Sequence, residues 1–217
     1  TGPFIVGNTI LYFTSTQAVI KEKPVDLDAG KKKKKKDFDD EAEPPVMVTK
    51  LYKVSHHDSV YSNKKELSPF YNLAGVDNSS CAFSPDKRRF FFARSIQPAE
   101  GKKYNEIYMC ELKGGKWLQP VRLGEQVNLS GYSNTNPTVA LNGKGYILYF
   151  ASDRPGGQGR MDIWSVAMTA DNKLSPAVNL GGVINTIDDE MTPYFDQPTQ
   201  TMYFSSSWHK GLGGLDI

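Results

Sequence analysis

Short apolar segments alternate with turn-forming residues along the chain, and the same order of segments returns at intervals of roughly 56 residues. One landmark is an apolar segment that ends in an aromatic pair and a small residue: Tyr12-Phe13-Thr14, Phe91-Phe92-Ala93, Tyr149-Phe150-Ala151 and Tyr203-Phe204-Ser205. A second landmark follows each pair, at Leu51-Tyr52, Ile107-Tyr108, Ile163-Trp164 and Asp216-Ile217. A fixed period of this length indicates a repeat architecture.

Two further landmarks complete the repeated unit. A segment with Ala82-Phe83, Thr138-Val139 or Tyr194-Phe195 comes before each aromatic pair, and a segment at 67–73, 117–123 or 174–180 comes after the second landmark. Turn residues such as Asn142-Gly143 and Gly114-Gly115 separate the segments and accept the positive φ of tight hairpins. Four short strands per unit, repeated in order, predict the blades of a β-propeller.

We therefore predict a single all-β domain over residues 1–217, a β-propeller of four-stranded antiparallel blades. The chain covers about four blades or part-blades, and we expect them to belong to a ring of six to eight. Thr1 is not a natural start and Ile217 falls inside a repeated motif, so we expect a fragment. The aromatic pairs are expected to pack one blade on the next.

A low-complexity charged loop over residues 16–49 interrupts the first unit between its second and third strands. Its central part, 21–43, holds 8 basic and 8 acidic residues, with Lys31–Lys36 followed by an acidic block. We expect a solvated loop, with contact to a protein or to nucleic acid as alternatives. The acidic block argues against nucleic acid because it would compete for the lysines.

Charge and cysteine content narrow the function classes. The net charge of +2 gives no broad field for nucleic acid or anionic lipid, and no apolar run approaches the ~20 residues of a membrane-spanning helix. Cys81 and Cys110 lie in strand-like apolar segments. They are expected to be buried free thiols, and a disulfide or a reactive thiol stays an alternative.

The sequence contains no zinc-binding His-Glu-x-x-His or Cys-x-x-Cys pattern and no Gly-x-Ser-x-Gly elbow. His56-His57-Asp58 and Asp188-Asp189-Glu190 could supply metal ligands, but a surface connection and a solvated acidic turn are the simpler interpretations. We therefore predict no catalytic, cofactor-binding or metal site, no cofactor, and a protein that is not an enzyme.

The most specific residues lie in two matching segments, 149–164 and 203–217, which share the aromatic pair, a Gly-rich turn and an Asp-Ile pair. Together with 179–195, they resemble the WD40-like (PD40) repeat of the TolB-related group, in the long form found in cell-envelope proteins of Bacteroidota. Asp162 and Asp216 occupy one phase, where a carboxylate can accept N–H bonds from the Gly-rich turn. We expect a structural role for both.

This resemblance implies a non-catalytic protein-binding scaffold of the bacterial cell envelope, a periplasmic, outer-membrane-associated component of the type IX secretion and gliding machinery. Its partners would be other envelope or secretion proteins, not nucleic acid. The chain would not span the membrane, and any lipid anchor would lie outside this segment. Two alternatives stay open: an accessory domain of a serine peptidase, and a peptidoglycan- or glycan-binding module with Trp208, Tyr132 and Trp164 as stacking platforms.

One face of the propeller is predicted to bind the partner. Strand direction alternates within a blade, so the links from second to third strand and from blade to blade share one face, and these links are the long ones. Long loops on a rigid scaffold are common recognition sites, and arginine and aromatic residues are enriched at interface hot spots. The predicted contact residues, with Arg154 and Trp208 near the centre, are Arg94, Tyr104, Arg154, Arg160, Trp208 and His209.

Overall fold

The computed structural model describes residues 4–6, 10–19, 46–58, 60–211 and 213–217. The charged stretch 21–43 lies outside the described residues, so the solvated loop stays a prediction. The strands on either side of it are longer than the sequence suggested, because they stay paired out to Val19 and Val46. Residues 16–19, assigned to the loop from sequence, are therefore strand, and so are residues 46–49, where a strand at Val46–Val48 was expected at the exit of the loop.

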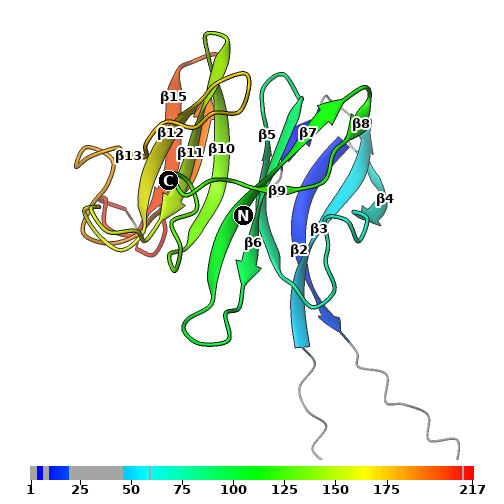
Figure 1. The fold of residues 1–217 in the computed structure, drawn as a ribbon, viewed down its shortest axis with the longest axis horizontal. Helices are drawn as coiled ribbons and strands as arrows, with labels where there is room; N and C mark the ends of the chain where they lie inside the picture. Colours follow the sequence, from blue (N-terminus) through cyan, green and yellow to red (C-terminus); the bar gives the residue numbers. More distant parts are fainter. Residues whose placement is uncertain (1–3, 7–9, 20–45, 59, 212) are drawn as a thin grey trace, which may run out of the picture.

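The strands form four antiparallel sheets in chain order, named blades 1 to 4 below (Figure 1). Blade 1 contains β1 (Phe4–Val6), β2 (Ile10–Val19), β3 (Val46–His57) and β4 (Val60–Glu66). Blade 2 contains β5 (Asn78–Phe83), β6 (Arg89–Ile96), β7 (Tyr104–Lys113), β8 (Lys116–Trp117) and β9 (Val121–Arg122). Blade 3 contains β10 (Asn134–Asn142), β11 (Gly145–Ser152), β12 (Asp162–Met168) and β13 (Val178–Asn179), and blade 4 contains β14 (Glu190–Asp196) and β15 (Thr201–Ser206).

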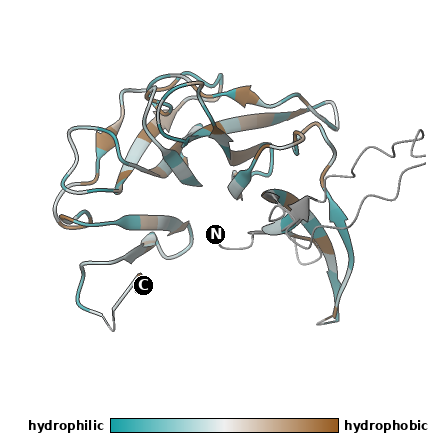
Figure 2. Ribbon diagram, turned by 90° about the horizontal axis from the view of Figure 1, so that it is seen from below, coloured by the Kyte–Doolittle hydropathy of each residue, from teal (hydrophilic) through white to brown (hydrophobic). Residues whose placement is uncertain are grey.

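Strands that are neighbours in the chain are also neighbours in each sheet, and the sheets follow one another around an arc (Figure 2). No helix occurs in the part of the chain that the structure describes. The predicted all-β propeller of four-stranded antiparallel blades is confirmed, with three sheets of four or five strands and a fourth sheet of two. The total of six to eight blades in the ring stays a prediction.

The outermost strand of each blade differs from the sequence prediction. In blade 2, Pro120 separates β8 from β9, and both pair with β7. In blade 3, Pro176 lies between an isolated bridge at Leu174 and β13. Proline has no N–H to donate to a ladder, so these segments make two short pairings instead of one strand. In blade 1, the outer strand is β4, and the landmark at 67–73 follows it as a connection.

The aromatic pairs pack the blades against each other, as predicted. Successive residues of a strand point to opposite faces, so Phe91 and Phe92 serve different interfaces. Phe92 lies in the core cluster between blades 1 and 2, whereas Phe91 joins Phe150 in the cluster between blades 2 and 3. All three side chains are 0% exposed, and burying each contributes about 1.5–3 kcal/mol. Cys81 and Cys110 are buried and free, which confirms the first interpretation of the thiols.

A buried asparagine fastens each blade-to-blade connection to the blade before it. Asn128 accepts a hydrogen bond from the Ile107 N–H (2.7 Å) and donates to the Ile107 carbonyl (2.8 Å) and the Leu123 carbonyl (3.0 Å). Asn72 makes the same pair of bonds to Leu51, and Asn185 makes it to Ile163. The three asparagine clips therefore tie each connection to the third strand of its blade.

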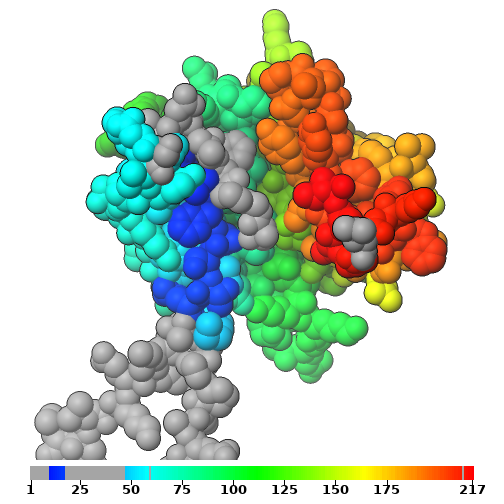
Figure 3. Space-filling view, turned by 180° about the vertical axis from the view of Figure 1, so that it is seen from behind, coloured from blue at the N-terminus to red at the C-terminus, as the bar shows by residue number. Residues whose placement is uncertain are grey.

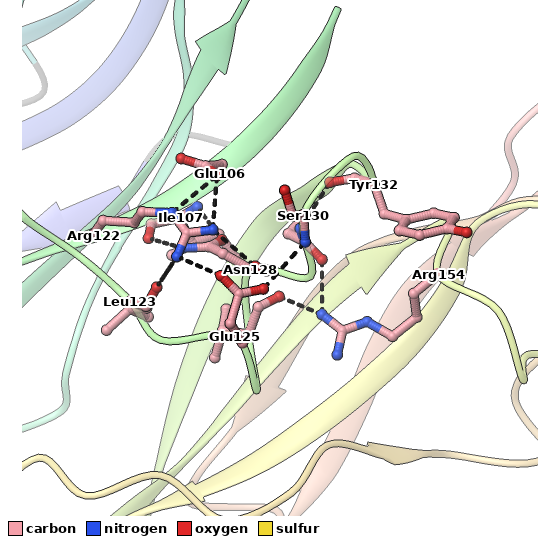
Figure 4. A network of polar contacts seen from close by, with 11 residues as sticks. Glu106, Ile107, Arg122, Leu123, Glu125, Asn128, Ser130, Tyr132 and Arg154 are labelled. Carbon is pink, nitrogen blue, oxygen red and sulfur yellow. Dashed lines mark hydrogen bonds and ion pairs between the residues drawn. The ribbon is translucent and has the colours of Figure 1, made fainter. Parts of the chain in front are cut away.

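Charged groups reinforce the clip of blade 2 (Figure 4). Arg122 donates to Glu106 (2.9 Å) and to the backbone carbonyls of Leu123 and Asn128, while a second carboxylate, Glu125, lies 3.1 Å from it. Glu106 is 6% exposed. A buried carboxylate needs such a partner because an unpaired charge is costly away from water.

The Gly-rich turn of blade 3 is organised by Asp162, as predicted. Its carboxylate accepts the N–H groups of Gln158 and Gly159 and the side-chain amide of Asn179. In blade 4, Asp216 accepts the N–H of Gly213 (3.0 Å) in the same way. The structural role expected for the two aspartates is confirmed.

Candidate functional site

The inner strands of blades 2, 3 and 4 each carry a β-bulge at the same phase of the repeat. Ser80, Asn136 and Thr192 lie at these bulges with φ of 37°, 51° and 49°, and the ladder register of each strand shifts there. A left-handed backbone at a non-glycine residue costs about 1–3 kcal/mol and is concentrated at functional sites. Bulges also redirect side chains, often next to active sites.

A cavity of about 340 Å³ lies where these three strands meet, and we call it the axial cavity. The three bulge residues line it together with Cys81 and Tyr194. Figure 3 shows the open side of the arc of blades, with β2 in blue and β14–β15 in orange and red on either side. The volume falls within the roughly 300–1,000 Å³ of small-molecule sites.

The polar groups of the axial cavity are partly satisfied by one another. The Asn136 N–H donates to Ser80 Oγ (3.0 Å), and Thr192 Oγ1 lies 2.7 Å from Ser205 Oγ. Asn136 Oδ1 is buried and has no hydrogen-bond partner among the described residues. Buried polar atoms are nearly always paired, so this oxygen is an unused acceptor on a residue that lines the cavity.

The described side chains that line the axial cavity include no carboxylate, lysine or arginine. Burial raises the pKa of the Cys81 thiol to about 12, so it is protonated at neutral pH. These side chains therefore offer hydroxyl and amide groups, an aromatic ring and no charged group. Such a surface suits a neutral, hydroxyl-rich molecule better than an ion.

Two of the predicted contact residues, Arg94 and Arg154, are buried within the blades rather than presented on loops. Their exposed fractions are 8% and 7%. The Arg154 guanidinium donates to Ser152 Oγ, Asn134 Oδ1 and the carbonyls of residues 126 and 127. Both arginines were predicted to lie on an exposed face. In the structure they are buried and form hydrogen bonds to neighbouring strands and blade connections.

The other four predicted contact residues lie closer to the surface. Trp208 is 59% exposed and Arg160 pairs with Asp188 at 3.1 Å. His209 is exposed and its ring nitrogen lies 2.9 Å from a backbone carbonyl, while Tyr104 is half-buried at the start of β7. Contact of these residues with a protein partner stays a prediction.

Of the three aromatic residues predicted to stack on a sugar, two are exposed and one is buried. Tyr132 and Trp208 are 36% and 59% exposed, but Trp164 is 7% exposed and belongs to the core between blades 2 and 3. The Arg154 guanidinium lies 5.3 Å from the Trp164 ring centroid and covers that ring. Trp164 as a stacking platform was therefore a wrong prediction.

No group of three or more metal-ligating side chains occurs in the described ranges. The described residues likewise include no helix that is long and apolar enough to cross a membrane.

The axial cavity residues were missed from sequence. Ser80, Asn136 and Thr192 are spaced by 56 positions, and Pro137 and Pro193 follow two of them. This spacing was a usable signal, but the three residue types differ and none is ionisable. They therefore match no catalytic or metal-ligating sequence pattern.

No protein-family model and no curated protein matches the chain. Solved structures do match in fold. A thermostable family-43 glycoside hydrolase aligns with TM-score 0.52 and 11% identity over 94% of this chain and 63% of its own. An alpha-L-arabinofuranosidase from Lactobacillus brevis aligns with TM-score 0.53 and 11% identity over 96% of this chain and 66% of its own. The chain thus spans about two thirds of their length, and at this identity the likeness shows the fold alone.

These matches contradict the resemblance to the TolB-related WD40-like repeat of envelope proteins, because the two solved structures that match in fold are a family-43 glycoside hydrolase and an arabinofuranosidase. The physical reason is that the quoted motif consists of residues that build a blade. Asp162 and the glycines of the preceding turn stabilise the connection between two strands, and the same residues can stabilise such a turn in any propeller.

The functional predictions drawn from that resemblance are corrected by the same finding. A non-catalytic scaffold of type IX secretion, and a protein that is not an enzyme, were both wrong, since the structural neighbours are glycoside hydrolases. The secretion, gliding and lipoprotein assignments have no support. The periplasmic location and the predicted protein partners stay predictions.

Proposed function

We propose that this chain is part of a glycan-processing enzyme and that its axial cavity holds a neutral sugar ring. The observation that carries the proposal is the cavity at the three bulges, whose side chains are uncharged and whose lining residue Asn136 has an unpartnered amide oxygen. The names of the two structural neighbours, a glycoside hydrolase and an arabinofuranosidase, support the substrate class.

Sugar hydroxyls match the groups in the cavity. Each hydroxyl can both donate and accept, so one can donate to Asn136 Oδ1 while another accepts from Ser80 or Thr192. Tyr194 is 51% exposed and lies beside them, so its ring offers an apolar face to the C–H groups of a sugar. Recognition would rest on hydrogen bonds and stacking, without an ion pair.

Cleavage of a glycosidic bond ordinarily requires two carboxyl groups that flank it. The described residues that line the axial cavity include none. Glu190, at the start of β14, is buried and accepts hydrogen bonds from Thr186 and Ser206. These residues therefore account for sugar recognition, and the carboxyl pair is expected elsewhere in the complete enzyme.

The test uses binding, with turnover as a separate readout. L-arabinose and an arabino-oligosaccharide are titrated into the chain by calorimetry, and hydrolysis of 4-nitrophenyl α-L-arabinofuranoside is followed in parallel. Asn136→Gly removes the amide while keeping a residue that accepts the positive φ. It is expected to weaken sugar binding about threefold to tenfold, the value of one hydrogen bond.

Asn142→Gly is the matched control, because Asn142 is an exposed residue at the other end of the same strand. It should bind sugar as the parent does. A folded chain that binds neither sugar, or equal binding by the parent and Asn136→Gly, contradicts the proposal.

A further inference from the structure

A second cavity lies between blades 1 and 2, and we call it the interblade groove. Its volume is about 600 Å³. One wall comes from the start of β3, at Met47 and Val48, and the other from the end of β6 and the β6–β7 loop, at Arg94, Ile96 and Lys103. In Figure 1 the start of β3 and the end of β6 lie at the lower ends of these strands. The interblade groove shares no lining residue with the axial cavity.

Arg94 is a buried cation without a carboxylate partner among the described residues. Its guanidinium donates to Asn78 Oδ1 (3.2 Å) and to the Tyr71 carbonyl (2.7 Å), and it lies 4.7 Å from the centroid of the Tyr108 ring. Even with a bond to the Tyr108 hydroxyl included, three neutral acceptors meet five N–H donors. Burial lowers the pKa of Arg94, and only Tyr108 and Cys110 oppose that effect.

Arg154, which has the corresponding place in blade 3, is the natural comparison. It uses the same kinds of partner, an inner-strand asparagine and the carbonyl of a blade connection, and adds Ser152 Oγ and the Gln126 carbonyl. The carboxylate of Asp153 also favours its charge. Arg94 has no counterpart of these two acceptors or of Asp153, and its side chain lines a cavity.

The other cation of the groove is already neutralised. Lys103 forms an ion pair with Asp77, whose second oxygen accepts the Thr49 N–H at 2.7 Å. Burial raises the pKa of Asp77, but the bonds from Lys103 and Thr49 outweigh it and hold that pKa below its ordinary value. Arg94 therefore leaves the groove with about one unbalanced positive charge.

We propose that the interblade groove binds the carboxylate of a sugar acid, with Arg94 as its ion-pair partner. The proposal rests on the proposed glycan-processing function and extends it to acidic sugars. One unbalanced charge suits a carboxylate better than a doubly charged phosphate. The apolar side chains of Met47, Val48 and Ile96 suit the C–H face of a sugar ring.

The test compares D-galacturonate with D-galactose, which differ only in the carboxylate at one carbon. Each is titrated into the whole chain by calorimetry at low and at raised salt. The expected result is that galacturonate binds at least tenfold more tightly than galactose, as for a hydrogen bond to a charged group. Raised salt should narrow the difference, because exposed parts of the pair are screened.

Three variants assign the effect to the groove. Arg94→Lys keeps the charge but loses the planar fork, and should weaken galacturonate binding about tenfold. Because that residue is buried, Lys103→Gln provides a second, more exposed test. It leaves Asp77 unpaired beside the groove and should weaken binding about fivefold. The exposed neighbour Lys102 serves as the control, and Lys102→Gln should bind as the parent does.

The outcomes separate this inference from the proposed function. Equal binding of galacturonate and galactose overturns the inference, and a loss on Asn136→Gly equal to that on Arg94→Lys would place the sugar acid in the axial cavity instead. If inorganic phosphate displaces galacturonate and binds with the same affinity, the groove binds anions without selectivity and the sugar-acid assignment is wrong. Neutral sugars that still bind through Asn136 leave the proposed function standing in each case.

Discussion

Removing one asparagine clip tests how the blades hold together. In Asn128→Ala, the side chain that bridges the connection and the third strand of blade 2 is lost. The Ile107 N–H, which belongs to a residue that is 0% exposed, then has no acceptor. The Ile107 carbonyl keeps one donor, because the Leu123 N–H also donates to it at 3.1 Å.

The magnitude follows from this asymmetry. An orphaned buried donor costs about 1–3 kcal/mol, and the two bonds lost to the carbonyls add about 0.5–1.5 kcal/mol each at most. Since both carbonyls keep a donor, that of Ile107 from the Leu123 N–H and that of Leu123 from Arg122 at 3.2 Å, we expect a loss of about 2–4 kcal/mol in the free energy of unfolding. The exposed Asn142 supplies the control, and Asn142→Ala should change it by less than about 0.5 kcal/mol.

Urea unfolding followed by circular dichroism measures the change through the midpoint, provided that the slope is unchanged. Amide hydrogen exchange gives the local readout, because the Ile107 N–H should lose protection more than its neighbours on β7. If Asn128→Ala unfolds at the same urea concentration as Asn142→Ala, the clip does not stabilise the blade and the reasoning is refuted.

Two other predictions concern packing and pH. Gly159→Ala should destabilise the fold by about 1–3 kcal/mol, because its Cβ would collide with backbone atoms of the loop before β14, whereas Gly182→Ala meets open space and should be neutral by thermal unfolding. Burial raises the pKa of Cys81, Cys110 and Tyr71 to about 12. The unfolded chain releases these protons first, so stability should fall as pH rises from about 9 to 12, and urea midpoints that rise over this range would contradict the assignment. A thiol reagent at about pH 8 should label neither cysteine until the protein unfolds.

The fold could be predicted because its main signals are local. Strand pairs such as Phe91 and Phe92 reach opposite faces by geometry alone, and a fixed period keeps the landmarks in phase. The asparagine clips could not be predicted in the same way. Asn72 and Asn128 bond to strands 21 residues earlier in the chain, and only the folded blade shows which asparagine has that partner.

The candidate site could not be predicted from the sequence, because its residues also depend on contacts that form only in the folded chain. The bulges at Ser80 and Asn136 depend on ladder register, and no local pattern fixes where a ladder slips. Arg154 was assigned to an exposed loop, but its guanidinium is buried because it donates hydrogen bonds to backbone carbonyls of the preceding connection. The family was misassigned because the Asp162 turn belongs to the architecture of a blade, and fold and function are separable.

Occupation of the axial cavity by a neutral sugar can be observed residue by residue. Nuclear magnetic resonance of the labelled chain during titration with L-arabinose tests it most directly. Sugar in the cavity should cause shifts confined to the inner strands, largest at the side-chain amide of Asn136 and at the backbone of Ser80 and Thr192. Shifts that are absent at saturation, or that cluster elsewhere while Asn136 stays unchanged, would contradict it.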